Sequence, residues 1–375
     1  MVWPGRVSRR AFLGSASALG GLILARPRLA WAQPSITSRS GTFTSGQSNT
    51  LTGTGFGTKG GTNANKPLIW ADFEASIDPT SLGHLTAWSE NTNLVLNSGA
   101  PQYGLSAQNV VGTWSPGVAS FSFGRVHSVS TLYIAARRYY DFTMTANQKF
   151  FRIFSSGSGD MVASTSNGGI CFDEICTTQA GRFDGFTPIA NAWQKEEFLW
   201  RKATTQDCGG TNIGDGYYEW IRDGVREQGL IDTLISELAA TYGQGTGIRI
   251  LDNFTDSGNL PPDGSKVYMD DLYVDDTWAR VVLGNASTLS ASTVREVQIP
   301  SAWSATSITI TVNEGSLTSG DRWLYVIDSS NVASAGFLIT TVSGPGRPPV
   351  VDRPPVFDRP PVVDRPGASS RPSVD

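Results

Sequence analysis

The stretch KVYMDDLYVDDTWARVVLG, residues 266–284, decides how the chain is organised. Apolar and acidic residues alternate along it at a period close to two, namely Val267, Met269, Leu272 and Val274 among Asp270, Asp271, Asp275 and Asp276. This alternation predicts a half-buried strand with an acidic edge. The next apolar run, Ala279–Leu283, predicts a strand of a different domain. We therefore expect this segment to close one β-sandwich and return the chain to a domain that began near residue 34.

The composition favours short strands and turns over long helices. The chain has 375 residues, of which 41 are glycine, 10% are aromatic and 17% are charged. A chain of this length is expected to hold about two domains and terminal segments. A glycine-rich composition with few charges is typical of proteins with many short strands.

The amino terminus predicts an export signal. Arg9 and Arg10 precede an apolar run diluted by glycine, and Ala30-Trp31-Ala32 offers small residues for cleavage. Residues 1–32 resemble a twin-arginine signal peptide, with an uncleaved anchor as the alternative. The segment holds five arginines and no acidic residue, so its removal changes the net charge from −4 to −9. We expect a secreted, periplasmic or cell-surface protein with no membrane span after cleavage and no nucleic-acid partner.

The cysteines are Cys171, Cys176 and Cys208, an odd number for an oxidising compartment. One disulfide and one free thiol are expected. We expect Cys208 to bond Cys176, with Cys171 as the alternative partner. The cysteines form no paired C-x-x-C motif for zinc, and we find no motif for an organic cofactor.

Two segments that are far apart in the sequence predict the halves of one small sandwich. Leu51–Gly57, LTGTGFG, reads as a strand and a tight turn, and 302–312, AWSATSITITV, reads as a strand. Both resemble the immunoglobulin-like TIG fold, whose first half carries a similar strand and turn. A half-sandwich cannot bury its own apolar face, so residues 33–66 and 279–342 are expected to complete each other. Two unrelated β-rich flanks are the alternative.

Residues 67–278 are expected to form an inserted domain, because many short strand patterns and one helical pattern, 229–242, predict a two-sheet jelly roll. Trp193-x-x-x-Glu197 and 215–224, DGYYEWIRDG, resemble paired strands of concanavalin-A-like jelly rolls, a class that includes carbohydrate-binding modules and polysaccharide lyases. Asp223-Gly224 predicts a hairpin turn. The predicted fold is therefore all-β, a concanavalin-A-like jelly-roll sandwich plus a small immunoglobulin-like β-sandwich. The repeated RPPVVD units of residues 343–375 predict a Pro-rich disordered tail.

Two kinds of site follow from the jelly-roll resemblance. It implies a structural Ca²⁺ where the first and last strands of the domain meet, held by the oxygen ligands of Asp72, Glu74, Asp270 and Asp271. The alternative is an acidic edge that prevents strand pairing between molecules.

A concave sheet that carries aromatic and polar side chains can bind sugars. The candidate side chains are Arg138, Tyr140, Lys149, Arg152, Glu197, Tyr218 and Trp220. We therefore expect an exported protein that recognises a polysaccharide or cell-surface glycan. The alternatives are a polysaccharide lyase acting on a uronate-containing glycan and a non-catalytic structural surface protein. Glycoside hydrolysis is disfavoured, because the sequence lacks the E-x-D-x-x-E strand of retaining glycosidases with this fold.

Overall fold

The protein is all-β over the part of the chain that the computed structural model describes: residues 33–74, 90–92, 94–113, 122–143, 149–155, 160–166, 169–173, 181–183, 189–201, 217–226, 245–249 and 262–339. These ranges contain 22 strands and one short 3-10 helix, Leu289–Ala291. For strands β4, β7, β9 to β12 and β16, the structure describes the backbone. Among the described residues, no helix has the length and hydrophobicity that crossing a bilayer requires.

Several predictions from the sequence lie outside the described residues. They are the export signal of residues 1–32, the helix at 229–242, the side chains of the three cysteines and the tail from residue 340. The export signal, the Cys176–Cys208 disulfide and the disordered tail therefore stay predictions.

The jelly-roll domain consists of two antiparallel sheets. The first has the order β12-β11-β10-β9-β16-β7-β4, with the bounds Gly181–Phe183, Gly169–Asp173, Asp160–Ser166, Lys149–Ser155, Gly245–Arg249, Ser122–Val129 and Glu90–Thr92. The second has the order β15-β14-β13-β8-β17-β6-β5, with the bounds Val225–Arg226, Tyr217–Arg222, Trp193–Arg201, Thr131–Tyr140, Lys266–Asp275, Asn109–Thr113 and Leu94–Asn97. Strand β3, Ile69–Ala71, also pairs with β17, so the first and last strands of the domain meet as expected.

The second domain is a smaller sandwich built from both ends of the described chain. Its strand order is β1-β2-β20-β19-β18-β21-β22, with the bounds Ser35–Ser40, Ser48–Thr54, Ser307–Thr311, Arg295–Trp303, Arg280–Gly284, Arg322–Ile327 and Phe337–Ile339. The first half of β19 pairs with β18 and its second half pairs with β20, so this strand links the two layers. The core between the layers includes Leu51, Phe56, Val281, Ile308 and Leu324.

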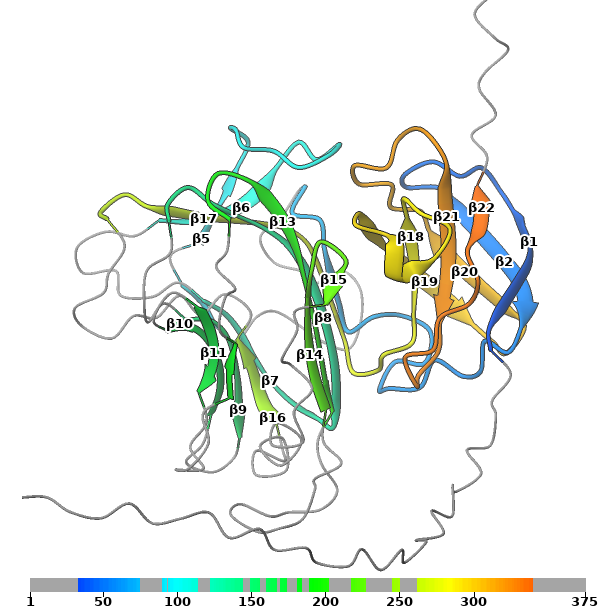
Figure 1. Cartoon of the computed structure of the whole chain (residues 1–375), viewed down its shortest axis with the longest axis horizontal. Helices are drawn as coiled ribbons and strands as arrows, with labels where there is room; N and C mark the ends of the chain where they lie inside the picture. Colours follow the sequence, from blue (N-terminus) through cyan, green and yellow to red (C-terminus); the bar gives the residue numbers. More distant parts are fainter. Residues whose placement is uncertain are drawn as a thin grey trace, which may run out of the picture.

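Strand β2 joins the carboxyl-terminal strands across the intervening jelly roll. It pairs with β20 from Ser48 opposite Thr311 to Thr52 opposite Ser307. In Figure 1 the blue strands β1 and β2 accordingly stand beside the yellow and orange strands β18 to β22. The pairing of these distant segments is confirmed, whereas the domain limits and the TIG resemblance stay predictions.

The single strand predicted over 302–312 is in fact a hairpin. Strand β19 ends at Trp303 and β20 begins at Ser307. The Ser304 amide donates to the carbonyl of Ser307 at 2.8 Å, and the Ser304 hydroxyl accepts from the Ser307 amide at 3.0 Å. A serine that bonds the backbone three residues away favours a turn over continued strand, which the alternation alone does not reveal.

A β-bulge explains the uneven apolar pattern of β17. Asp270 lies opposite Arg137 and Tyr273 lies opposite Ala135, so three steps along β17 match two along β8. Asp271 within the bulge has a φ of 49°. One extra residue reverses the alternation, and the apolar residues before and after the bulge therefore share one face.

The acidic residues of β17 do not form an open edge. Strand β17 lies between β8 and β6, and both Asp270 and Asp275 are completely buried. Asp275 Oδ2 lies 2.6 Å from Lys59 Nζ, and burial raises the pKa of Asp275 to about 7 despite this ion pair. The predicted acidic edge is wrong, because the sequence does not show that this strand has neighbours on both sides.

The two domains share an apolar contact on the outer face of the second jelly-roll sheet. Tyr133, Leu199 and Trp278 pack there with Val297 of the small sandwich. The Trp278 indole Nε1 donates to the carbonyls of Leu132 and Trp200, at 3.1 and 3.2 Å. The connection between β17 and β18 is thereby anchored to the sheet before the chain enters the second domain.

Candidate functional site

A buried charge cluster extends this apolar contact, with Glu296 at its centre. Its carboxylate accepts hydrogen bonds from Arg137 Nη2 at 2.9 Å, the Tyr103 hydroxyl at 2.6 Å and the Ser316 amide at 3.1 Å. Burial alone would raise the pKa of Glu296, but Arg137 and Lys195 hold it below its usual range. The jelly roll therefore supplies the positive charges that stabilise a carboxylate of the small sandwich.

Glu197, a predicted sugar-binding residue, belongs to the same cluster. It accepts a hydrogen bond from the Tyr133 hydroxyl at 2.8 Å, and its Oε1 lies 3.6 Å from Arg295 Nη1. Burial would raise the pKa of Glu197, yet Lys195 and Arg295 lower it to about 2. Glu197 therefore stabilises the contact between the domains.

Three other predicted sugar-binding residues are also buried. Arg138 Nη1 lies 2.8 Å from Glu196 Oε2, and the Tyr140 hydroxyl donates to Glu196 Oε1 at 3.0 Å. Arg138, Tyr140 and Trp220 are 3%, 0% and 3% exposed, and Glu197 is 1% exposed. Side chains with so little surface cannot line an open sugar-binding face, which corrects their assignment to one.

The remaining sugar candidates, Lys149, Arg152 and Tyr218, are placed by their backbone positions on β9 and β14. Arg152 lies directly opposite Arg249 of β16, so the two positions share one face of the first sheet. Arg249 could not be identified from the sequence, because its partner lies almost a hundred residues earlier. The only local signal is the position of Arg249 at the end of the short strand Gly245–Arg249.

The opposite face of the same strands has an apolar pattern. Ile153 of β9 lies opposite Met161 of β10 on one side and Ile248 of β16 on the other. Positions in strand register share a face, and neighbouring positions along a strand lie on opposite faces. The first sheet thus has Ile153, Met161 and Ile248 in a row on one face, extended by Arg125 of β7 opposite Ile248, and the Arg152–Arg249 pair on the other.

The four residues predicted to bind calcium meet only in part. Asp72 Oδ1 accepts from the Glu74 amide at 3.3 Å, and the Glu74 carboxylate accepts from the Ala107 amide at 2.9 and 3.1 Å. Asp271 Oδ2 lies 3.4 Å from Asn313 Nδ2 of the small sandwich. Over the described ranges, no group of three or more Asp, Glu, His or Cys residues is placed to hold a metal ion. Calcium binding by these four side chains stays a prediction.

Asp270 is the residue through which calcium can be tested. Its Oδ2 is buried without a hydrogen-bond partner, and burial together with Asp271 and Glu74 raises its pKa. A folded pKa above the unfolded value of about 4 means that stability is lost as the pH rises through the folded pKa. Without calcium, Asp270→Asn should therefore raise the melting temperature at pH 8 and leave it nearly unchanged at pH 4.

Asp270 is either a calcium ligand or a buried carboxylate without an ion. Calorimetric melting at pH 7.5, in calcium and in chelator, distinguishes these two possibilities. A bound calcium predicts a melting temperature about 5 °C or more higher in calcium for the natural protein. The Asp270→Asn variant should lose that difference. Equal melting temperatures of the natural protein in calcium and in chelator would contradict calcium binding at this site.

The predicted turn at Asp223-Gly224 is confirmed, and it contacts the small sandwich. The two residues have φ angles of 47° and 72° and connect β14 to β15. The Gly224 carbonyl accepts a hydrogen bond from Arg295 Nη2 at 2.8 Å. A Cβ at Gly224 would lie 1.9 Å from the carbonyl oxygen of Ser292, so this position requires glycine.

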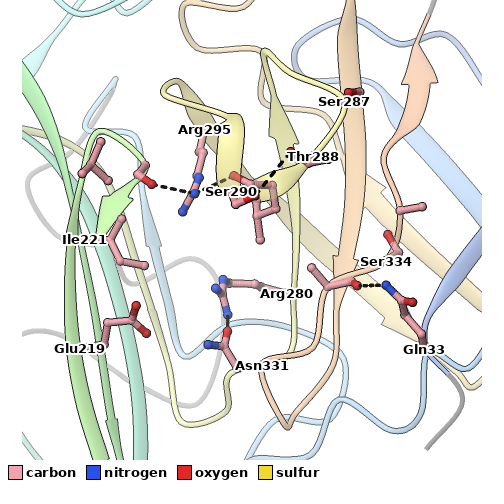
Figure 2. A pocket seen from close by; sticks show the side chains of 15 residues that line it. Gln33, Glu219, Ile221, Arg280, Ser287, Thr288, Ser290, Arg295, Asn331 and Ser334 are labelled. Carbon is pink, nitrogen blue, oxygen red and sulfur yellow. Dashed lines mark hydrogen bonds between the residues drawn. The ribbon is translucent and has the colours of Figure 1, made fainter. Parts of the chain in front are cut away.

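A cavity of about 660 Å³ opens beside this turn, between β14 and the loops of the small sandwich. Figure 2 shows Glu219 and Ile221 on one wall, Arg280 and Asn331 across from them, and Thr288 and Ser290 at another side. Arg280 Nη1 donates to Asn331 Oδ1 at 3.1 Å and to the Trp278 carbonyl at 2.7 Å. This pocket could not be predicted from the sequence, because its walls come from both domains.

No family model matches the chain, and no curated protein matches it. Among solved structures, the cellulose-induced protein Cip1 is similar at 17% identity and a TM-score of 0.41, over 56% of this chain and 97% of that one. The alginate lyase vAL-1 from Chlorella virus is similar at 14% identity and a TM-score of 0.36, over 50% and 92%. The alginate lyase Aly36B is similar at 14% identity and a TM-score of 0.31, over 48% and 86%. No conclusion about the function of this chain rests on likenesses of this size.

Proposed function

We propose that this is an exported protein that binds an acidic polysaccharide on the first jelly-roll sheet. The observation that carries the proposal is the direct pairing of Arg152 on β9 with Arg249 on β16. Two positive residues side by side on neighbouring strands repel each other unless water or an anion screens them. We therefore propose that an anionic ligand lies across the face that these two positions share.

An acidic polysaccharide supplies the anions that such a pair favours. Guanidinium groups form two parallel hydrogen bonds with a carboxylate, so paired arginines suit a polymer of uronate sugars. Phe154 lies two residues after Arg152 in continuous register, at a position of the same face. Aromatic residues beside cations provide stacking surfaces for sugar rings. The strand Lys149–Ser155 thus combines both elements of sugar-acid recognition.

Affinity electrophoresis tests this proposal. The protein is run through gels that contain alginate, glucuronan or a neutral glucan of similar length. We expect retardation in the two polyuronate gels, weaker retardation at high salt because of screening, and none in the neutral gel. Equal mobility in all gels would contradict the proposal and favour a structural surface protein.

The same substrates distinguish a binding protein from a lyase. A lyase removes the proton beside the uronate carboxylate and breaks the neighbouring glycosidic C–O bond, whose oxygen leaves with the other part of the chain and takes up a proton. The product sugar is unsaturated and absorbs in the ultraviolet. Tyrosine and lysine side chains can take such a proton, but Tyr140 and Lys195 are buried and bonded to Glu196 and to the Arg295 carbonyl. Binding without turnover is therefore the expected result. Absorbance that increases with time on alginate or glucuronan would instead show lyase activity.

A further inference from the structure

We infer that the pocket between the two domains is a second ligand site, which takes a small hydroxylated carboxylate such as a single sugar acid. Its volume of about 660 Å³ lies in the range of small-molecule sites, and such sites occur preferentially between domains. The pocket is built by β14 and the small sandwich, away from β9 and β16. The inference therefore does not depend on the polysaccharide face.

Arg280 lines this pocket as a buried cation, 2% exposed, and keeps one donor that the protein does not use. The other arginine, Arg295, is engaged by the protein through the carbonyls of Ser292, Gly224 and Leu289, at 3.0, 2.8 and 2.7 Å. Arg280 instead forms its hydrogen bonds through Nη1, and its Nε has no hydrogen-bond partner.

The Arg280 guanidinium is also held in place. It stacks on the Tyr133 ring at 4.3 Å from the ring centroid. A buried guanidinium with an unused donor, fixed by an aromatic ring, is suited to receive a carboxylate.

The remaining walls match a sugar ring. Thr288 and Ser290 are exposed, and the Ser290 hydroxyl donates to the Thr288 hydroxyl over a long 3.5 Å. The Thr288 side chain does not cap the 3-10 helix that follows it, so the two hydroxyls can also bond a ligand. Val225 is 57% exposed and lies with Leu289 in the wall. A sugar ring has hydroxyls at its rim and an apolar C–H face, and these walls offer partners for both.

Calorimetric titration of the full chain with D-glucuronate tests this site, with D-glucose as the ligand that lacks the carboxylate. We expect saturable glucuronate binding at least about tenfold tighter than glucose binding, because a charge-assisted hydrogen bond is lost with glucose. No saturable binding of glucuronate, or equal affinity for the two sugars, would overturn the inference.

Two neighbouring substitutions locate the binding. Ser290→Trp fills the pocket, whereas Ala291→Trp adds the same ring at an exposed position of the same helix outside the pocket. We expect Ser290→Trp to abolish glucuronate binding and Ala291→Trp to retain it. Unchanged binding in Ser290→Trp would overturn the site.

Arg280→Lys keeps the charge and removes the guanidinium geometry, so it should weaken binding about tenfold. If this variant does not fold, the comparison of Ser290→Trp with Ala291→Trp still tests whether glucuronate binds in this pocket. The Arg152→Gln/Arg249→Gln double variant should bind glucuronate in this pocket like the natural protein. Unchanged polysaccharide retention in this double variant, with glucuronate binding intact, would therefore contradict the proposed function alone.

Discussion

Replacing Glu296 with glutamine is expected to lower the free energy of unfolding by about 3–5 kcal/mol. The substitution keeps the shape of the side chain but removes its charge, so Arg137 and Lys195 lose the carboxylate that compensates their burial. Burial already lowers the pKa of Lys195 to about 8. Chemical denaturation followed by far-ultraviolet circular dichroism measures the loss.

A double-mutant cycle with Arg137→Met shows whether the loss belongs to the pair. Each single variant leaves one buried charge without its partner, whereas the double variant leaves neither. The double variant should therefore be more stable than the sum of the two single losses predicts. Additive losses of less than about 1 kcal/mol each would mean that the charge cluster does not hold the domains together.

Replacing Trp278 with alanine is expected to lower the free energy of unfolding by about 3–5 kcal/mol. The indole fills the space between Tyr133 and Val297, and its Nε1 satisfies the carbonyls of Leu132 and Trp200. Alanine would leave a cavity at the point where the chain passes from one domain to the other. Unfolding monitored by circular dichroism and by calorimetry measures the effect.

Trp278→Phe separates packing from hydrogen bonding at this position. Phenylalanine retains most of the buried ring and loses the N–H donor. This substitution should therefore lower the free energy of unfolding by about 1–3 kcal/mol. A Trp278→Ala variant as stable as Trp278→Phe would contradict the packing argument. A separate melting transition for each domain in Trp278→Ala would show that this side chain couples them.

The sequence allowed prediction of features that depend on local pattern. The alternation in Lys266–Asp275 predicted strand β17, and Asp223-Gly224 predicted a hairpin turn with positive φ angles. The pairing of β2 with β20 followed from the need of each half-sandwich for a partner. All three rest on which residues share a face or occupy a turn.

The site residues were harder to predict, because strand alternation does not show what covers each face. Glu197 lies on the face of the second jelly-roll sheet that contacts the small sandwich. Tyr140 lies on the opposite face of that sheet, where its hydroxyl donates to Glu196. Both resemble sugar-binding residues in the sequence and both are buried in the structure. The pairing of Arg152 with Arg249 depends on the register of strands far apart in the chain, which local patterns do not encode.

Isothermal titration with alginate oligosaccharides tests the central claim most directly, comparing the natural protein with Arg152→Gln/Arg249→Gln. Arg39→Gln, which removes an arginine on strand β1 of the other domain, is the matched control. The account predicts saturable binding by the natural protein and the control, and affinity at least about a hundredfold weaker in the double variant, because two charge-assisted contacts are lost. Equal affinity in all three proteins, or no binding by any of them, would contradict it.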